Sequence, residues 1–333
     1  MMNKLFSTSL ISAAAILLSA CSSTPERPNW LDGADVNYPA NVYLTASGQA
    51  QTASVADNRA LANLAKIFEV SIADESIDFS EASISQSNAS GSTIRQVDNK
   101  QTLSRFVNTQ AQQVLQGVSI AERWQDPVTG QQSSLAVMKR APAAALFMQS
   151  IRAADDQTSA AVKYAEQQAP NPLIALSSLE SARQRQITRL NDNNNLRVVT
   201  GNDINVEYSV ETLTQMIKIR LAALSFTTSA TDEQALLSLQ GAASEVGVQL
   251  KDNSQYKLVL TLDKGAVEQR QAWYWLRGNI VLHVMDGNNS ISNKRWPFKI
   301  SAQSEQLLEQ RLAAKLTMKL PAYVYQILTP EVK

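Results

Sequence analysis

The chain has 333 residues, 44% of them hydrophobic, which is long enough for two domains of ordinary size. Basic and acidic residues number 30 each, so the formal net charge is zero and there is no electrostatic case for nucleic-acid binding. Cys21 is the single cysteine, which excludes an intramolecular disulfide and leaves each domain to be held together by its core.

The first two dozen residues contain a lipobox. After a short basic start, residues 5–18 form an apolar run of about 14 residues, shorter than the about 20 that a membrane-spanning helix needs. The run ends in Leu18, Ser19, Ala20 and Cys21, with small residues suited to a processing site. This segment resembles bacterial lipoprotein precursors. The resemblance implies a diacylglyceryl group on Cys21, cleavage before it and N-acylation; an ordinary signal peptide with a chance cysteine is the alternative.

The residues after Cys21 bear on where the anchored chain resides. Ser22 and Ser23 stand where retained lipoproteins have an aspartate, and the resemblance to sorted lipoproteins implies the outer membrane, with the chain facing the periplasm. Each buried methylene contributes ~0.8 kcal/mol, so two or three acyl chains give a permanent attachment. Residues 21–38 are rich in proline and lack an apolar period, which predicts a tether.

Residues 39–152 are predicted to form a first α+β domain, from alternating apolar residues in strands and apolar spacings of three and four in helices. For residues 93–116, helix and strand fit equally well. The other predicted elements are a strand at 42–48, a helix at 53–68, an extended segment at 72–84, a loop at 86–92, a hairpin at 117–140 and a helix with Pro142 in its first turn.

Two stretches of this region carry a family resemblance. They are VYLTASGQA at residues 42–50, with the alanine-rich helix after it, and LQGVSIAERW at residues 115–124, with its returning strand. Together they resemble the LPP-twenty family of outer-membrane lipoproteins, which includes a flagellum-associated member. The resemblance covers about residues 30–150 and includes no catalytic signature. Familiar members mostly have one domain, so the resemblance implies no role for the second half.

The rest of the chain is predicted as a helical connector at 153–195, interrupted around Pro170 and Pro172, and a second α+β domain at 196–333. The asparagine-rich run at 191–195 is interpreted as the domain boundary. The elements predicted beyond it are a short strand at 196–199, helices from 210 and from 232, strands at 256–262, 273–285 and 291–300, and a last helix broken near Pro321.

The three long strands have apolar residues at their even-numbered positions, so one face of their sheet is predicted to be core. Pro297 cannot donate a ladder hydrogen bond, which predicts an edge strand. The odd-numbered face carries Trp273, Trp275, Arg277 and His283. Tryptophan and arginine are enriched at binding hot spots, so Trp273, Trp275 and Arg277 are candidate contacts with a partner. A helix covering this face as a second core layer is the alternative.

Enzymatic readings find little support. His283 is the only histidine and is interpreted as a partly buried structural residue, because no serine or cysteine nucleophile can be placed beside it. The sequence has no Cys/His metal spacing, phosphate loop or dinucleotide fingerprint, so we expect no cofactor, no metal and no catalytic residue. A glycosidase that uses two carboxylates is left open by residue type.

The sequence therefore predicts an α+β protein: two α+β domains with mostly antiparallel sheets, joined by a helical segment, behind a cleaved lipoprotein signal peptide. The leading hypothesis is a lipid-anchored, non-catalytic scaffold or assembly factor at the periplasmic face of the outer membrane. It would contact the membrane through acyl chains on Cys21 and a protein partner, with neither nucleic acid nor a small-molecule substrate. The alternative is an activator of a periplasmic enzyme such as a peptidoglycan synthase, which the short tether disfavours.

Overall fold

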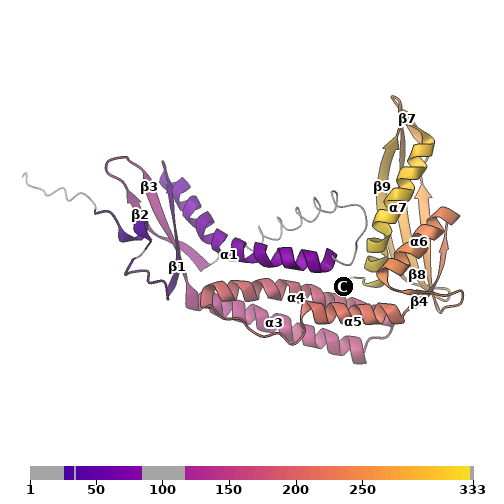
Figure 1. Cartoon of the computed structure of the whole chain (residues 1–333), viewed down its shortest axis with the longest axis horizontal. Coiled ribbons are helices and arrows are strands. Elements are labelled where there is room, and N and C mark those ends of the chain that lie inside the picture. Colours follow the sequence, from indigo (N-terminus) through magenta and orange to yellow (C-terminus); the bar gives the residue numbers. More distant parts are fainter. Residues whose placement is uncertain (1–25, 34, 85–116, 331–333) are drawn as a thin grey trace, which may run out of the picture. The chain divides into compact units, whose positions relative to one another are not determined.

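The computed structural model describes residues 26–33, 35–84 and 117–330 and has the predicted mixed α+β character, with mostly antiparallel sheets (Figure 1). The chain forms two compact units. Unit 1 consists of Met1–Leu146 with Asn194–Asn202, and unit 2 of Phe147–Asn193 with Asp203–Lys333. Each unit therefore combines segments from both sides of position 195, where the sequence suggested a simple boundary.

Unit 1 is built on an antiparallel sheet of β1 (Tyr43–Ala50), β2 (Val118–Gln125) and β3 (Gln132–Lys139), in the order β1-β3-β2. The strand at 42–48 and the hairpin at 117–140 are thus confirmed. Helix α1 (Ala53–Ile84) lies against β1 and β3. Side chains alternate between the two faces of a strand, and β3 is buried on both. Ala136 and Met138 share the face of Ser134, which contacts α1, whereas Leu135 and Val137 point the other way.

The contact between β1 and α1 depends on Gly48. A Cβ at this position would lie 2.5 Å from the carbonyl oxygen of Ala56 and still closer to the amide nitrogen of Ala60. Strand and helix backbones therefore meet directly, with Ala56 and Ala60 fully buried beside the glycine. Asp57 fixes the same helix to the sheet, because it accepts hydrogen bonds from Arg123 at 2.9 Å and from Ser134 at 2.6 Å. These two donors, Arg123 first, lower the Asp57 pKa.

The predicted tether at 21–38 is wrong for its second half. Residues Asn29–Asp32 form a 3-10 helix, and Trp30 packs on Leu135 and Val137 with only 4% of its surface exposed. The indole Nε1 of Trp30 donates a hydrogen bond to Glu122 at 2.8 Å. A buried tryptophan contributes enough apolar area to fix a segment that lacks any apolar period.

Helix α1 also differs from the prediction, which ended it near residue 68 and made 72–84 extended. The helix runs to Ile84. Residues 53–84 contain neither glycine nor proline, so nothing in the backbone ends the helix once it has begun. The predicted loop at 86–92 and the ambiguous segment at 93–116 lie outside the described residues.

Two long helices follow, α3 (Arg140–Gln167) and α4 (Pro172–Thr200), and the predicted interruption around Pro170 is confirmed. The break at 191–195 and the strand at 196–199 are wrong, because α4 continues through both. Asparagine is a weak helix former, but here tertiary contacts override that preference. Asn193 accepts a hydrogen bond from the Ile204 amide at 2.9 Å, and Leu196 and Val199 are buried.

Unit 2 contains a six-stranded sheet. Its order is β5-β4-β6-β8-β7, with β9 paired to the other side of β8. The strands are β4 (Ser225–Ala230), β5 (Gln249–Leu250), β6 (Tyr256–Lys264), β7 (Glu268–Arg270), β8 (Trp273–Asp286) and β9 (Asn289–Ala302). The parallel pairs of β4 with β5 and β6 were not predicted, since β4 has Phe226 as its one large apolar residue. The other pairs are antiparallel.

The predicted helices of this unit are confirmed as α5 (Val210–Ala223) and α6 (Glu233–Val246). Their starts follow from side-chain caps. Ser209 accepts a hydrogen bond from the Thr212 amide, and Asp232 accepts one from the Ala235 amide. Gly247 ends α6 in the left-handed conformation, with φ 92°.

The even-numbered face of the sheet is the core, as predicted. Leu258, Leu260, Ile280 and Leu282 are at most 1% exposed and belong to one cluster with helix α7 (Glu305–Leu328). Strand β9 pairs only with β8 within the described chain, so the edge position expected for Pro297 is confirmed.

Helix α7 does not break at Pro321, contrary to the prediction. The proline lies inside the helix, which continues to Leu328. A proline removes one helical hydrogen bond and strains the preceding turn. The last turns nevertheless bury Val324, Ile327 and Leu328 completely or nearly so, and this burial offsets that cost.

The hairpin of β8 and β9 turns at Gly287 and contains a bulge. Asp286 pairs with Asn289 and Met285 with Ser290, but Val284 pairs with Ser292. Ile291 is therefore the extra residue on β9. Beyond it, odd-numbered residues of β8 face odd-numbered residues of β9 all the way to Trp275 and Ser301.

Candidate functional site

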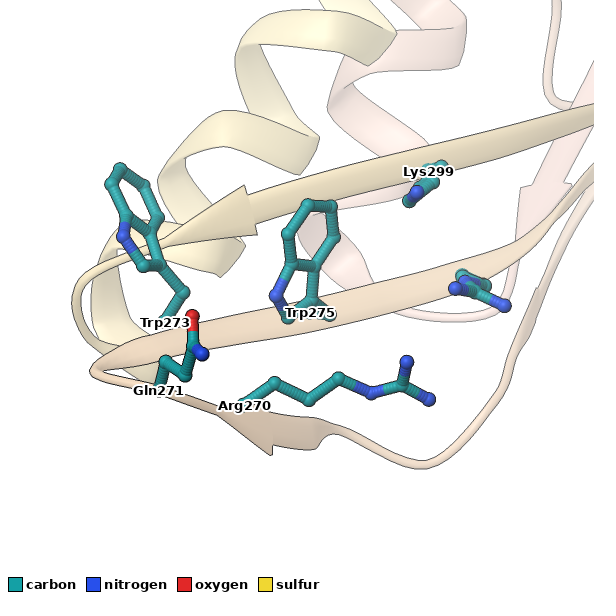
Figure 2. Close-up of a pocket in the computed structure, with 6 residues that line it drawn as sticks. Arg270, Gln271, Trp273, Trp275 and Lys299 are labelled. Atoms are coloured by element: carbon teal, nitrogen blue, oxygen red, sulfur yellow. The ribbon is translucent and has the colours of Figure 1, made fainter.

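One end of the odd-numbered sheet face forms an open hollow of about 420 Å³, lined by β7, β8, β9 and the β7–β8 turn (Figure 2). We call this surface the tryptophan face. Its residues are Arg270, Gln271, Trp273, Trp275, Arg277 and Lys299. The structure thus brings together the three residues singled out in the sequence, Trp273, Trp275 and Arg277.

Strand register explains how the tryptophan face is assembled. Arg270 of β7 is directly opposite Trp273 of β8, and Arg277 of β8 is directly opposite Lys299 of β9. Opposed residues in an antiparallel pair project from the same side of the sheet. The ammonium of Lys299 lies 4.6 Å from the ring centroid of Trp275, within the range of a cation–π contact (Figure 2).

The side chains of this face are accessible. Trp273 is 38% exposed, and Arg270, Arg277 and Lys299 are also exposed, whereas Trp275 is half-buried. The alternative of a second core layer therefore does not describe this end of the sheet. Helices α6 and α7 pack with the even-numbered face. At this end of the sheet, most side chains of the opposite face are exposed.

The turn that presents the tryptophan face is strained. Gln271 and Ala272 connect β7 to β8 with φ angles of 49° and 35°, both in the left-handed region. Two-residue hairpins of this kind usually carry Asn-Gly, since a non-glycine residue there costs about 1–2 kcal/mol. The strain falls between Arg270 and Trp273, the first opposed pair of the face.

Three residues of the face were missed in the sequence. Arg270 and Gln271 belong to a short strand and a turn without apolar alternation, so no pattern marked them. Lys299 lies on a predicted strand and shares the odd parity of Trp275 and Arg277. The odd-numbered position of Lys299 on the neighbouring strand was the signal that could have identified it.

His283 does not lie in the hollow. It lies farther along β8, half-buried, with Val259 and Asn293 directly opposite on the neighbouring strands. In the described part of the chain it makes no hydrogen bond or ion pair with a serine or a carboxylate. Among the residues that the structure describes, no nucleophile–base pair is assembled around it.

One well-connected group of ionisable side chains in unit 2 surrounds Glu180. This carboxylate accepts hydrogen bonds from Arg183 at 2.7 Å, from Gln184 at 2.7 Å and from the Tyr325 hydroxyl at 2.6 Å. Burial alone would raise the Glu180 pKa, but the three donors outweigh it and lower the pKa, while burial and the nearby carboxylate raise that of Tyr325. The carboxylate is held ionised between α4 and α7, as in a structural ion pair.

Two further features concern metal binding and membrane spanning. Across residues 26–33, 35–84 and 117–330, no three His, Cys, Asp or Glu side chains are grouped so that they could hold a metal ion. No helix within these ranges is long and apolar enough to cross a membrane. The predicted lipid-attachment residue Cys21 lies outside the described residues.

Comparison with known proteins gives matches to solved structures. No protein-family model matches the sequence, and no curated protein matches it. A secreted protein of Helicobacter pylori is 13% identical, with 86% of this chain and 98% of the other covered and a TM-score of 0.43. A minor lipoprotein of Acinetobacter baumannii is 15% identical, with 33% and 96% covered and a TM-score of 0.27.

Rare lipoprotein B of Shewanella oneidensis is also similar, at 12% identity, with 31% of this chain and 90% of the other covered and a TM-score of 0.23. The similar structures thus include named lipoproteins and a secreted protein. The more specific resemblance to the LPP-twenty family stays a prediction.

Proposed function

We propose that this protein is a lipid-anchored, non-catalytic envelope protein that acts as a scaffold or assembly factor at the periplasmic face of the outer membrane. The observation that carries the proposal is the lipobox at residues 18–21, where small residues precede the single cysteine. Ser22 and Ser23 support the outer membrane as the destination.

The arrangement of side chains supports binding rather than catalysis. Exposed Trp273 and Arg277 are the residue types that contribute most to protein interfaces. The Glu180 cluster has its hydrogen bonds satisfied internally, and His283 has no partner to activate among the described residues. We therefore assign the tryptophan face as the contact with a protein partner in the cell envelope.

Lipidation provides the first test. We expect Cys21→Ser to abolish incorporation of radiolabelled palmitate and to release the protein from the membrane fraction, because a hydroxyl does not replace a thiolate in alkylation. The parent chain should be labelled and sediment with outer membranes. Label on the serine variant, or an unlabelled parent, would contradict both the lipid anchor and the localisation.

The tryptophan face provides the second test. We expect the Trp273→Ala, Trp275→Ala double variant to lose its crosslinked partners in the envelope, with a nearly unchanged melting temperature, because both side chains project from the non-core face. Ile219→Ala with Leu237→Ala is a matched control, since those residues are 61% and 58% exposed on α5 and α6.

The captured proteins also separate the two predicted roles. Structural components of an envelope assembly support the scaffold, whereas an inner-membrane peptidoglycan synthase supports the alternative of an enzyme activator. Unchanged crosslinking in the tryptophan variant, or equal loss in the control, would refute the assignment of the contact surface.

A further inference from the structure

The odd-numbered face of the unit 2 sheet has an excess of positive charge. Its charged residues on β6 to β9 are five cations and two carboxylates, identified from strand register: Lys257, Arg270, Arg277, Arg295 and Lys299 against Asp263 and Glu268. This face therefore carries a net charge of about +3, although the whole chain has a formal charge of zero. This excess lies on the face that the core does not use.

Most of these cations form no ion pair among the described residues. Arg270 forms an exposed ion pair with Glu268 at 2.8 Å. By contrast, Arg277 and Arg295 make no hydrogen bond or ion pair through their side chains in the described part of the chain. The Lys299 ammonium lies over the ring of Trp275. Arg277 and Lys299 are directly opposed, and like charges in that position repel each other. An anion between them would remove the repulsion.

Apolar surface accompanies the charge. Trp273 is exposed beside the strained β7–β8 turn, and Trp275 lies between it and Arg277 along β8. A ligand that fits would bring negative groups to Arg277 and Lys299 and an apolar group to Trp273. Its negative groups would be planar, since a guanidinium recognises carboxylates in a two-pronged geometry.

We infer that the tryptophan face binds an acidic segment of a partner protein, with its carboxylates on Arg277 and Lys299 and an apolar side chain on Trp273. The inference rests on the proposed function and specifies the chemistry of the partner. The partner segment would be rich in aspartate or glutamate and would lie along β8.

Two other anionic partners fit the arrangement less well. A membrane surface would touch the β7–β8 turn, but the cations continue along the strands to Arg295 and Lys257, away from that turn. An anionic glycan would stack on open ring faces, but the ring of Trp275 is already approached by Lys299 at 4.6 Å. An extended acidic segment matches both the length and the composition of the face.

The test uses the full-length lipidated chain in detergent micelles. The probe is a fluorescein-labelled peptide of alternating glutamate and serine with one central phenylalanine, and the control peptide has lysine in place of glutamate. We expect anisotropy to report binding of the acidic peptide only, weakening as salt rises from about 50 mM to about 500 mM, because screening shortens the range of the attraction.

Charge reversal locates the binding. We expect Arg277→Glu with Lys299→Glu to weaken binding of the acidic peptide at least about tenfold, since both cations are replaced by repelling carboxylates. Lys251→Glu, which reverses an exposed cation in the loop after β5, should leave binding within about twofold. All three altered residues are exposed, so melting temperatures should match that of the parent.

Several results would overturn the inference: no binding of the acidic peptide, equal binding by the reversed variant, or binding of the lysine peptide. If short-chain phosphatidylglycerol in the micelles binds in place of the peptide, the ligand is a lipid. If oligogalacturonate binds instead, the ligand is a glycan. Failure of the peptide together with partner crosslinks that depend on Trp273 and Trp275 would refute the acidic partner but leave the proposed function standing. Absence of palmitate from the parent chain would refute the lipid anchor and the localisation, but not the binding of an acidic segment.

Discussion

Replacing Gly48 by valine is expected to destabilise unit 1 by at least about 3 kcal/mol. Even the Cβ of the new residue would lie 2.5 Å from the Ala56 carbonyl oxygen and closer still to the Ala60 amide. These are backbone atoms, so no rotamer change can relieve the overlap. Helix α1 would have to move away from β1, exposing Ala56 and Ala60.

Thermal unfolding followed by circular dichroism measures this effect. Gly241→Ala is the matched control. Nothing lies within 4 Å of a Cβ there, and the residue is inside helix α6, so alanine should be neutral or stabilising by up to about 1 kcal/mol. A valine variant as stable as the parent would mean that β1 and α1 are not in direct backbone contact.

Leu260→Ala is expected to cost about 2–5 kcal/mol in unit 2, because it leaves a cavity in the core. Leu260 is 1% exposed and packs in the cluster formed by the sheet and α7. Thr261→Ala, one position along the same strand, should cost less than about 1 kcal/mol, since Thr261 is exposed on the opposite face.

Denaturant unfolding of the two variants tests this difference. The slope of the free energy of unfolding with denaturant should be unchanged in both, so that the midpoints compare stability directly. Equal costs for the two substitutions would show that the strand phase is wrong, and with it the assignment of Trp273 and Trp275 to the non-core side.

The strand phase was predictable because it repeats. Apolar residues at even positions recur on three strands, so one periodicity places Leu260, Ile280 and Phe298 in the same core and places Trp273 opposite them. The assembly of Trp273, Trp275 and Arg277 on one surface follows from that parity alone. Helices α5 and α6 were also predictable, because each has local signals that agree with a helix.

What the sequence could not show depends on contacts distant in the chain. The segment around Trp30 has no period, and its burial depends on β3, about a hundred residues later. The asparagine run at 191–195 favours a break locally. In the structure, however, the Asn193 side chain accepts a hydrogen bond from the amide of Ile204, which lies after the end of the helix. Lys299 joins the tryptophan face through pairing with Arg277, which depends on the hairpin register.

The bulge at Ile291 makes the hairpin between β8 and β9 sensitive to changes of length. Without the extra residue, Phe298 would stand opposite Arg277, and the polar and apolar faces of β9 would be exchanged. A one-residue deletion between 286 and 292 would therefore move every later side chain of β9 to the opposite face of the sheet. A two-residue change would preserve the alternation. Natural length variation in this connection should occur in steps of two, so that related chains can be aligned here by parity rather than by residue identity.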